Sequence, residues 1–427
     1  MKKLLLLISL FTCLAITQTI QAESVKGRIQ AVSKKAGTVQ IGVEDKKVVV
    51  RINKATRLEG FSSIDELSPP DLIEAELEPG QPATTVKKIF FGLPPGIEID
   101  TGELLKTMTG EAPYYLFDAR PVKRFGKAHI PSANPAHPKD DNFLSLLPGD
   151  KAALLVFYCG GPTCPYTGIA VDMAGKAGYT NLKGYQAGLP GWKKSKLPVH
   201  TESGWLAKNL NTQTVIMDVR DTTASSRSHI KGAVALPLAD LQAMTQGFIK
   251  NQTIPELPGV TDQRAPIVVY ADSHTSREAL LAYKELRDWG YSGATVLNGG
   301  FSGWQQAGLE TAQGPAATAI VYEKKLAPGA IAPAEFVALE KSREGVLFID
   351  VRTEQETATG ALKDARLIPL EKLDDATSKL PRDKELVIYC ANGIRAEMAY
   401  ETLNKQGFKV RFLNEAITLD KQGNFTL

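Results

Sequence analysis

The spacing of apolar residues divides the chain into two parts near residue 97. Before this point, apolar and polar residues alternate with a period of two, as between Val25 and Ala31, and turn residues such as Pro79-Gly80 separate the alternating stretches. This period predicts half-buried β-strands. After it, short continuous apolar runs alternate with longer amphipathic stretches, which predicts buried parallel strands joined by helices.

The first part, residues 23–97, is predicted to be a small all-β domain. Several short strands at this spacing are typical of a small barrel, and the pattern resembles a five-stranded, OB-like barrel. Such barrels can bind nucleic acids or sugars, but basic and aromatic residues do not interleave here. We therefore expect a docking or spacer role for this domain.

The second part contains a threefold repeat. Each copy has an apolar run that ends in Asp-x-Arg, a second apolar run that ends in Tyr, a short loop and an amphipathic stretch. The Asp-x-Arg motifs begin at Asp118, Asp218 and Asp350, and the strand-ending tyrosines are Tyr158, Tyr270 and Tyr389. The repeat predicts one α/β fold in three copies, each a parallel sheet with helices on both faces.

The residue that follows the strand-ending Tyr differs between the copies: it is Cys159 in the first, Ala271 in the second and Cys390 in the third. A cysteine here stands where a strand stops and a helix begins. Consecutive N–H groups of the loop, together with the helix N-terminus, can bind an anion and favour the thiolate. The alternative is a buried structural cysteine at a strand end.

Taken in order, the repeated motifs resemble the rhodanese (sulfurtransferase) domain. Besides Asp-x-Arg and the Tyr-Cys strand end, they include His-Ile-x-Gly-Ala and Gly-Gly-x-x-Gly-Trp. These further motifs are carried by His129-Ile130, His229–Ala233, Ala187–Trp192 and Gly299–Trp304. The resemblance implies three tandem rhodanese-like domains, over residues 98–199, 200–312 and 326–427.

In the rhodanese family the cysteine of this loop carries sulfane sulfur as a persulfide, and the loop backbone holds the persulfide anion. The resemblance therefore implies that Cys390 is the sulfur carrier of the third copy. Its predicted substrate-binding residues are Ala391, Asn392, Gly393, Ile394 and Arg395.

Arg395 would hold an oxyanion donor such as thiosulfate or stabilise the departing sulfite; the alternative is a solvated residue in the first helical turn. The related phosphatase loop has one residue more, so phosphate chemistry is disfavoured. The third copy departs from the family pattern, because Ala361 takes the place of the motif histidine and Asn414–Ile417 replaces the Gly-Trp ending.

In the first copy, Cys159 occupies the sulfur-carrier position and is predicted to be catalytic, with Gly160 and Gly161 binding substrate through the backbone. Cys164 follows five residues later. It is either half of a structural disulfide or a resolving thiol that closes a disulfide and releases an adduct from Cys159. This loop contains no Arg, so oxyanion binding would depend on backbone N–H groups and the helix dipole.

The second copy has no nucleophilic thiol at Ala271. Asp272 and His274 could in principle act on a proton or a metal, but we expect an inactive domain kept for packing or ligand shape. We interpret the three Asp-x-Arg motifs as fold markers, in which the Asp accepts backbone N–H groups and the Arg pairs within its domain.

The first residues predict export. Lys2 and Lys3 precede an apolar run, and Ile20-Gln21-Ala22 offers a cleavage site before Glu23, as in a secretory signal peptide. A lipid-anchored Cys13 is the less favoured alternative. We therefore expect a periplasmic protein without a transmembrane segment, in which the three remaining cysteines cannot all be paired.

The formal charge of the 427-residue chain is only +3, which gives no reason to expect nucleic acid as a partner. The expected function is that of an exported sulfurtransferase that moves sulfane sulfur from a thiosulfate-like anion to a thiol acceptor, without a metal or organic cofactor. Two alternatives stay open: a thiol redox or chalcogen-oxyanion (for example selenite) binding protein using the cysteines, and a non-catalytic multi-domain binding protein. A protein sulfur acceptor or redox partner is also possible under these hypotheses.

Overall fold

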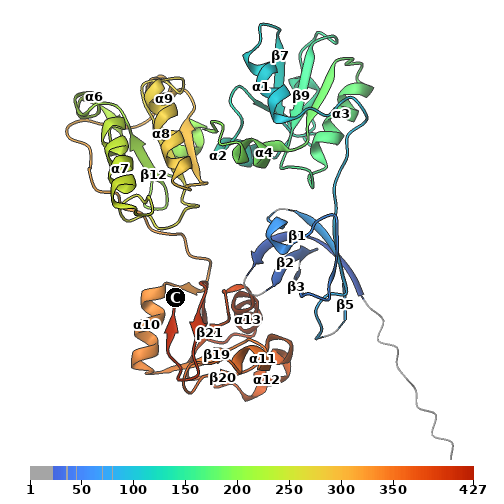
Figure 1. Ribbon diagram of the computed structural model, residues 1–427, viewed down its shortest axis with the longest axis vertical. Helices are drawn as coiled ribbons and strands as arrows, with labels where there is room; N and C mark the ends of the chain where they lie inside the picture. The colour runs from blue at the N-terminus through green and yellow to red at the C-terminus, as the bar shows by residue number, and fades with distance from the viewer. Residues whose placement is uncertain (1–22, 35–36, 45, 70, 79) are drawn as a thin grey trace, which may run out of the picture.

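The structure is a computed structural model that describes residues 23–34, 37–44, 46–69, 71–78 and 80–427. It consists of four units in chain order (Figure 1): a β domain, residues 23–97, and three α/β domains that we call domain 1, residues 98–199, domain 2, residues 200–312, and domain 3, residues 326–427. The signal peptide that the sequence predicts lies outside the described residues.

The β domain is a six-stranded sheet with the strand order β3-β2-β1-β5-β6-β4. Val39, Ile41, Val50, Ile73 and Val86 have no exposed surface and form its core. Its elements are β1 (Glu23–Ser33), β2 (Thr38–Val43), β3 (Lys46–Arg51), β4 (Arg57–Glu59), the 3-10 helix η1 (Ile64–Glu66), β5 (Leu72–Leu77) and β6 (Thr85–Lys88).

Two details of this domain differ from the prediction. There are six strands instead of five, because the short polar strand β4 has no recognisable apolar pattern. In the described part of the chain, the two outer strands β3 and β4 do not pair with each other, so no closed barrel forms.

Domain 1 has a parallel sheet with the strand order β10-β9-β7-β8. Its strands are β7 (Tyr114–Asp118), β8 (Asn134–Pro135), β9 (Leu154–Tyr158) and β10 (Leu182–Tyr185). Its helices are α1 (Thr101–Thr109), α2 (Val122–Lys127), η2 (Phe143–Leu146), α3 (Tyr166–Lys176) and α4 (Gly188–Lys194).

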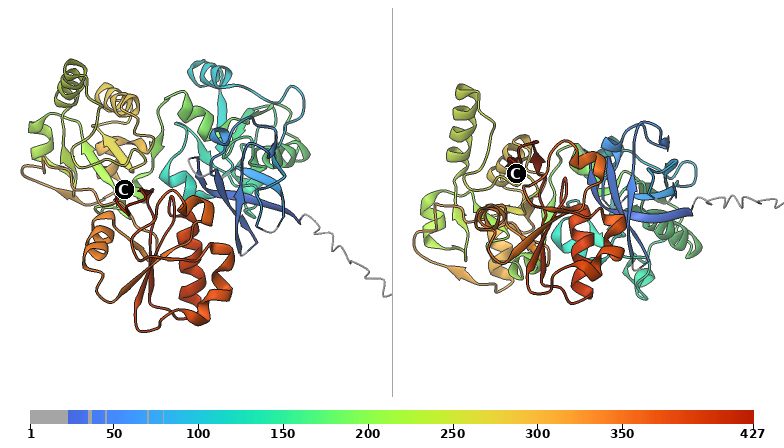
Figure 2. Two further views of the ribbon diagram at one scale, coloured as in Figure 1. Left: turned by 60° about the horizontal axis from the view of Figure 1, so that its bottom comes forward. Right: turned by 90° about the horizontal axis from the view of Figure 1, so that it is seen from below.

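Domain 2 repeats this plan in a parallel sheet with the order β11-β16-β15-β12-β14, beside a short antiparallel pair of β13 and β17. Its strands are β11 (His200–Thr201), β12 (Val215–Asp218), β13 (His229–Ile230), β14 (Val234–Ala235), β15 (Ile267–Tyr270), β16 (Ala294–Leu297) and β17 (Thr311–Ala312). Its helices are α5 (Ser203–Ala207), α6 (Thr222–Arg227), α7 (Leu238–Asn251), α8 (Arg277–Asp288) and α9 (Gly300–Gln306). The end of α7 projects from this domain (Figure 2, right).

Domain 3 has a parallel sheet with the order β18-β22-β21-β19-β20. Its strands are β18 (Ala330–Ile331), β19 (Val346–Asp350), β20 (Arg366–Leu367), β21 (Glu385–Tyr389) and β22 (Val410–Leu413). Its helices are α10 (Pro333–Ser342), α11 (Glu354–Thr357), η3 (Leu370–Lys372), α12 (Leu373–Ala376), η4 (Thr377–Lys379) and α13 (Ile394–Lys405). A hairpin of β23 (Thr418–Leu419) and β24 (Phe425–Thr426) ends the domain, where domains 1 and 2 have the Gly-Trp helices α4 and α9.

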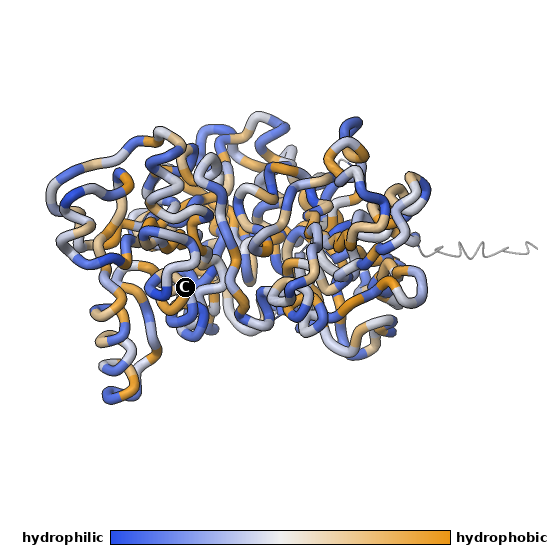
Figure 3. The backbone as a smooth tube through the Cα atoms, turned by 90° about the horizontal axis from the view of Figure 1, so that it is seen from above, coloured by the Kyte–Doolittle hydropathy of each residue, from blue (hydrophilic) through white to orange (hydrophobic). Residues whose placement is uncertain are grey.

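Each central strand is buried on both faces, as its continuous apolar sequence predicts. In β21, Leu386 and Ile388 pack into one cluster of the core and Val387 and Tyr389 into another on the opposite face. Strand β9 divides its residues between two clusters in the same way. Hydrophobic stretches run through the inside of the domains, whereas many outer turns are hydrophilic (Figure 3). The predicted α/β fold with helices on both faces of a parallel sheet is confirmed.

The β domain contacts both domain 1 and domain 3 (Figure 1). Arg28 of β1 donates to the carbonyl of Thr163, 3.2 Å away, in domain 1. Lys47 of β3 forms ion pairs with Glu397 and Glu401 of α13, at 3.1 and 2.8 Å. Arg28 thus contacts the loop after the central strand of domain 1, and Lys47 contacts the helix after the central strand and loop of domain 3. The sequence predicts the candidate functional residues in these loops and at the starts of these helices.

Candidate functional site

Cys390 lies directly after β21 and has no exposed surface. Its Sγ lies 3.6 Å from Oδ1 of Asn392, and the same oxygen accepts the N–H group of Ile394 at 3.4 Å. Helix α13 begins at Ile394, with Gly393 as its N-cap. Cys390, Asn392 and Ile394 thus form one short hydrogen-bonded loop at the start of a helix.

Gly393 is the residue in this loop for which a side chain would not fit. Its φ is +88°, and an added Cβ would lie 2.5 Å from Oδ1 and 2.7 Å from Cα of Asn414. In domains 1 and 2 the glycine that makes the close contact lies outside the site loop. A Cβ added to Gly188 or Gly300, in the segment after β10 or β16, would meet backbone atoms of the site loop. In domain 3, by contrast, it is the glycine of the site loop itself, Gly393, that leaves the space that Asn414 occupies.

In every domain, the segment after the strand that follows the site helix donates a backbone hydrogen bond to the site loop. The N–H group of Leu189 donates to Cys159 at 3.1 Å, and that of Phe301 donates to Ala271 at 2.8 Å. In domain 3 the N–H group of Ile417 donates to the carbonyl of Ala391 at 3.2 Å. Although its Gly-Trp ending is missing, domain 3 keeps this support for the loop.

Arg395 is buried and points its two terminal nitrogens at one carboxylate. Nη1 and Nη2 donate to the two oxygens of Glu356 at 2.7 and 2.6 Å. Nε is buried and has no hydrogen-bond partner among the residues that the structure describes. A bidentate pair of this kind fixes the plane of the guanidinium, so Arg395 is not the solvated helix residue that the sequence left open.

Glu356 and Arg395 each stabilise the charged form of the other. Burial alone would raise the pKa of Glu356, but the hydrogen bonds and charge of Arg395, followed by hydrogen bonds from Thr353, lower it to about 2. Burial would lower the pKa of Arg395, yet Glu356 and the sulfur of Cys390 raise it. Arg395 therefore stays charged beside both the carboxylate and the thiol.

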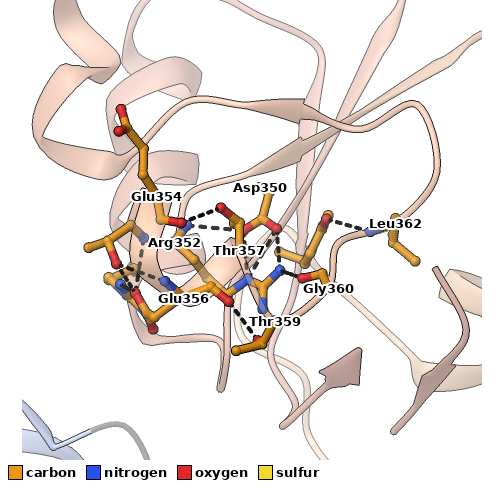
Figure 4. A network of polar contacts seen from close by, with 11 residues as sticks. Asp350, Arg352, Glu354, Glu356, Thr357, Thr359, Gly360 and Leu362 are labelled. Atoms are coloured by element: carbon orange, nitrogen blue, oxygen red, sulfur yellow. Dashed lines mark hydrogen bonds and ion pairs between the residues drawn. The ribbon is translucent and has the colours of Figure 1, made fainter. Parts of the chain in front are cut away.

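Glu356 is held by the first turn of α11. Thr353 and Glu356 form a capping box, in which each side chain bonds the backbone N–H group of the other. This box follows the Asp-x-Arg motif, in which Arg352 lies between Asp350 and the carbonyl of Gly360 (Figure 4). The motif thus sets the position of the residue that orients Arg395.

The Asp-x-Arg motifs have the same geometry in all three domains. Each Asp accepts the backbone N–H group and Nε of its Arg. Each Arg also donates to a carbonyl eight residues further on, in Ala128, Ser228 and Gly360. Their interpretation as structural markers is confirmed.

In domain 1 the structure brings Cys159 and Cys164 together. Both are free thiols, and the Sγ of Cys159 donates to the carbonyl of Cys164 at 3.4 Å and to that of Gly161 at 3.9 Å. The loop turns back because the N–H group of Cys164 donates to Gly161 at 2.9 Å. An added Cβ at Gly160 would lie 3.8 Å from the Cys164 sulfur, so the glycines lie against the thiol pair.

The two thiols of domain 1 differ in acidity. Burial raises the pKa of Cys159 well above its ordinary value, and the neighbouring Cys164 adds to this effect. The pKa of Cys164 is lowered to about 6, chiefly by a hydrogen bond from Cys159 and in spite of burial. The N–H groups of Tyr166 and Gly160 and the charge of Arg28 lower it further.

In domain 2 the polar residues of the loop are engaged in structural contacts. Asp272 accepts Nη1 of Arg220 at 3.2 Å, and Nδ1 of His274 accepts the N–H group of Gly299 at 3.0 Å. Within the described ranges, no three His, Cys, Asp or Glu residues are placed to hold a metal ion. A proton-transfer or metal role for Asp272 and His274 gains no support from these contacts.

A cavity of about 440 Å³ opens between the β domain and α13. Its wall includes Lys47 and Arg51 from β3 and Arg395 and Met398 from α13. The wall also carries the carboxylates of Glu23 and Glu78, so charges of both signs line this cavity.

Sequence reasoning missed three residues that contact the site loops or their helices. Glu356 carries a visible signal, since Thr353-x-x-Glu356 is the sequence of a capping box, but nothing local indicates its bond to Arg395. Arg28 and Lys47 belong to alternating strands of another domain and carry no signal. The local pattern of apolar and polar residues does not indicate contacts between residues that are far apart in the sequence.

With this geometry in place, comparison with known proteins identifies the family. The model of the rhodanese-like domain family matches residues 101–195, 202–307 and 333–419. These three matches cover more than half of the chain, and the chain belongs to the rhodanese-like domain family. The resemblance stated from the sequence is confirmed.

Two relatives show how far the similarity extends. A sulfurtransferase from Allochromatium vinosum is 38% identical over 65 residues, which are 15% of this chain and 61% of the relative. The thiosulfate sulfurtransferase GlpE from Actinobacillus succinogenes is 33% identical over 102 residues, which are 23% of this chain and 78% of the relative. The match thus spans less than two thirds of the first relative.

Among solved structures, a thiosulfate sulfurtransferase from Pseudomonas aeruginosa is similar with 17% identity and a TM-score of 0.22. The similarity covers 74% of this chain and 66% of that one. In the part of the chain that the structure describes, no helix is long and apolar enough to span a membrane.

Proposed function

We propose that the protein is an exported sulfurtransferase in which Cys390 carries sulfane sulfur from a thiosulfate-like donor to a thiol acceptor. The observation that carries this proposal is the loop from Cys390 to Arg395. It combines a thiol at the end of β21, a glycine-capped helix start and a buried arginine beside the sulfur.

The chemistry needs no cofactor. The Cys390 thiolate attacks the outer sulfur of thiosulfate, the S–S bond of the donor breaks, and sulfite leaves with the electron pair. The new S–S bond leaves a persulfide anion on Cys390. A thiolate acceptor then attacks the outer sulfur, takes it as its own persulfide, and restores the Cys390 thiolate.

Arg395 and the start of α13 supply the positive potential for this sequence. The helix N-terminus favours an anion, and the charge of Arg395 lies beside the sulfur. Because Glu356 accepts one N–H of each terminal nitrogen of Arg395, we infer that the Nε–H, the second N–H of each terminal nitrogen and the loop N–H groups are what remains for the donor or persulfide.

Turnover of thiosulfate with cyanide as the acceptor tests the assignment. We expect the Cys390→Ser variant to lose at least about 100-fold in rate, because a removed nucleophile is not replaced by the rest of the site. The Cys159→Ser variant is the matched control and should keep its turnover. Equal turnover of Cys390→Ser and the parent, or the absence of any persulfide in the parent, would contradict the proposal.

We also propose that residues 1–22 direct export to the periplasm and are removed. The supporting observation is the order of Lys2-Lys3, the apolar run and Ala22. The N-terminal sequence of the protein recovered from the periplasmic fraction of a bacterial host should begin at Glu23. Retention of Met1, or a lipid on Cys13, would contradict cleavage at this position.

A further inference from the structure

A second cavity, of about 220 Å³, lies where domain 1 meets domain 2. Helices α2 and α4 are on the side of domain 1 that faces domain 2 (Figure 1). Lys127, the last residue of α2, and Lys193 of α4 line the cavity from domain 1. Arg264 and Ser292, from the segments before β15 and β16, line it from domain 2. The cavity therefore belongs to neither domain alone.

The charged residues that line this cavity all have the same sign. Lys127, Lys193 and Arg264 are cations, and no Asp or Glu is among the described residues of the lining. The carboxylate of Asp262, which is not part of the lining, lies 3.9 Å from Nε of Arg264 and so makes only a long ion pair. Three cations with so little compensation give the cavity a positive potential, which attracts anions.

Lys193 is the cation of this group that most needs a partner. It is partly buried, and its ammonium group has no hydrogen-bond or ion-pair partner among the described residues. Burial lowers the pKa of Lys193 to about 8, and the positive charges of Arg287, Arg120 and Lys127 add to this effect in that order. Because an ammonium group that is partly removed from water is costly without a counter-charge, an anion in the cavity would stabilise the charged form.

The two lysines are held in place through their own backbones. Oγ1 of Thr201 in β11 donates to the carbonyl of Lys127 at 2.8 Å. Nη2 of Arg287 in α8 donates to the carbonyl of Lys193 at 2.9 Å. Each of these bonds joins a lysine of domain 1 to a side chain of domain 2. The cations are therefore fixed before a ligand arrives, which lowers the entropy cost of binding.

The wall contributed by domain 2 is equally close-packed. A Cβ added to Gly293 would lie 2.6 Å from the carbonyl oxygen of Arg264 and would also clash with the carbonyl of Ala265. Only a glycine lets the segments before β15 and β16 approach each other in this way. Arg264 and Ser292 are thereby brought onto the same wall of the cavity.

We propose that this cavity between domains 1 and 2 binds a small oxyanion with two negative charges, of the sulfate or phosphate class, through Lys127, Lys193 and Arg264. Its volume is several times the roughly 30 Å³ that one water molecule occupies in the liquid, so such an anion fits together with bound water. None of the lining residues belongs to the loops that follow the strand-ending tyrosines. The site is therefore separate from sulfur transfer, and its ligand connects cations of two domains.

The first test follows the reactivity of the Lys193 amine in the full chain, because acylation requires the unprotonated form. The protein is treated briefly with acetic anhydride at a series of pH values, and acetylation is measured by peptide mass. In sodium chloride the midpoint for Lys193 should be at about 8. Sodium sulfate at the same ionic strength should move it to a pH about one unit higher, as a nearby opposite charge does, and so slow acetylation at neutral pH about tenfold.

Lys194 is the internal control for this measurement. It is the exposed neighbour of Lys193 in α4 and does not line the cavity. Its acetylation should be the same in both salts. Equal protection of Lys193 and Lys194 by sulfate would overturn the proposal, because it would show a general salt effect.

Sodium phosphate, again at the same ionic strength, is the second probe and distinguishes the two sources of such an anion. Stronger protection of Lys193 by sulfate than by phosphate would assign the cavity to sulfur oxyanions, and the reverse order would assign it to phosphate compounds; both results support an oxyanion site. Acetylation of Lys193 that millimolar sulfate and phosphate leave unchanged would overturn the proposal. Neither probe donates sulfane sulfur, so the result does not depend on whether Cys390 carries sulfur.

The second test measures the affinity for sulfate by calorimetry. Lys193→Gln and Arg264→Gln each remove one cation, from domain 1 and domain 2 respectively, and each should weaken binding at least about tenfold, in line with the loss of a charge-assisted hydrogen bond. Lys194→Gln is the matched control and should bind as the parent does. An affinity that is unchanged in both cavity variants, or reduced as much by Lys194→Gln, would overturn the proposal. Circular dichroism checks that the variants are folded, and the acetylation test in the parent requires no substitution.

Discussion

The loops of domains 3 and 1 occupy the same place in the same fold and are built differently. The domain 3 loop has one thiol, Cys390, and its own arginine, which Glu356 orients. The domain 1 loop has two cysteines, the thiol of Cys159 donates to the carbonyl of Cys164, and Arg28 of the β domain donates to the carbonyl of Thr163 in the same loop. The comparison teaches that the fold fixes where the thiol stands, while the cation near the loop comes from the same domain in one case and from the β domain in the other.

Domain 2 shows what is left when the thiol itself is missing. Ala271 stands at the thiol position, and the Asp and His of its loop bond to Arg220 and Gly299. The Asp-x-Arg frame is nevertheless intact. Folding of this domain therefore does not require the chemistry of the loop.

The largest effect that would sharpen this comparison is the loss of Arg395. We expect Arg395→Gln to lower kcat/KM for thiosulfate on the order of 100-fold, the size seen when one donor to a developing anion is removed. Arg277→Gln is the control, because Arg277 is the first residue of helix α8, which follows the loop of Ala271 in domain 2, and is exposed. Similar losses in the two variants would show that Arg395 has no special role; circular dichroism checks that both remain folded.

The next largest effect is the loss of stability expected when Gly393, which contacts Asn414, is replaced. Gly393→Ala places a Cβ 2.5 Å from Oδ1 of Asn414 at a φ of +88°, whereas Gly345→Ala, at a φ of +68°, meets nothing within 4 Å. We expect about 1 kcal/mol of destabilisation for Gly345→Ala from the backbone conformation alone. Gly393→Ala should cost roughly 2 kcal/mol more because of the clash. Denaturant unfolding measures both, and equal costs would mean that Asn414 yields freely.

A smaller effect on stability tests the hydrogen bond that the strand-ending tyrosine makes in both domain 1 and domain 3. Tyr158→Phe removes the hydroxyl that accepts the N–H group of Ile130 at 3.0 Å, and Tyr389→Phe removes the one that accepts Leu362 at 3.2 Å. Each change should lower the free energy of unfolding by about 1–3 kcal/mol, because a buried donor is left unpaired. The exposed Tyr115→Phe is the control and should change little. A large loss of unfolding free energy in only one of the two variants would contradict a common structural role for this tyrosine.

The smallest effect is the dependence of domain 3 stability on pH. Glu356 has its pKa lowered from 4.5 to about 2 in the folded protein. Its ionised form therefore stabilises the fold above pH 4.5, and this contribution is lost as the pH falls towards 2. The difference in unfolding free energy between the parent and Glu356→Gln should shrink over that range. A difference that stays constant would show that Glu356 and Arg395 do not form a charged pair.

Much of this architecture could be predicted because it is periodic or repeated. The apolar runs ending at Tyr158, Tyr270 and Tyr389 predicted the central strands, and the repeated Asp-x-Arg predicted the frame around them. The loop positions of Cys159 and Cys390 followed from the strand–helix junction. These features depend on contacts between near neighbours or on a recurring order of motifs.

The remaining features depend on contacts between distant segments. Strand β4 is too short and polar to show a pattern. The loss of the Gly-Trp ending from domain 3 was visible in the sequence, but the β23–β24 hairpin that follows Asn414–Ile417 was not predicted. The pairing of Glu356 with Arg395 spans two elements, and that of Arg28 with Thr163 spans two domains. Such contacts arise from tertiary packing, which a local sequence window does not contain.

The central claim is that Cys390 carries the transferred sulfur, and the most direct measurement is the mass of its peptide after reaction. The reduced full chain is incubated with thiosulfate, alkylated and digested, and the peptide containing Cys390 is weighed in the parent and in Arg395→Gln. We predict one additional sulfur atom on Cys390 in the parent and a much smaller fraction in the variant. A Cys390 peptide without added sulfur in the parent, under conditions in which thiosulfate is consumed, would contradict the account.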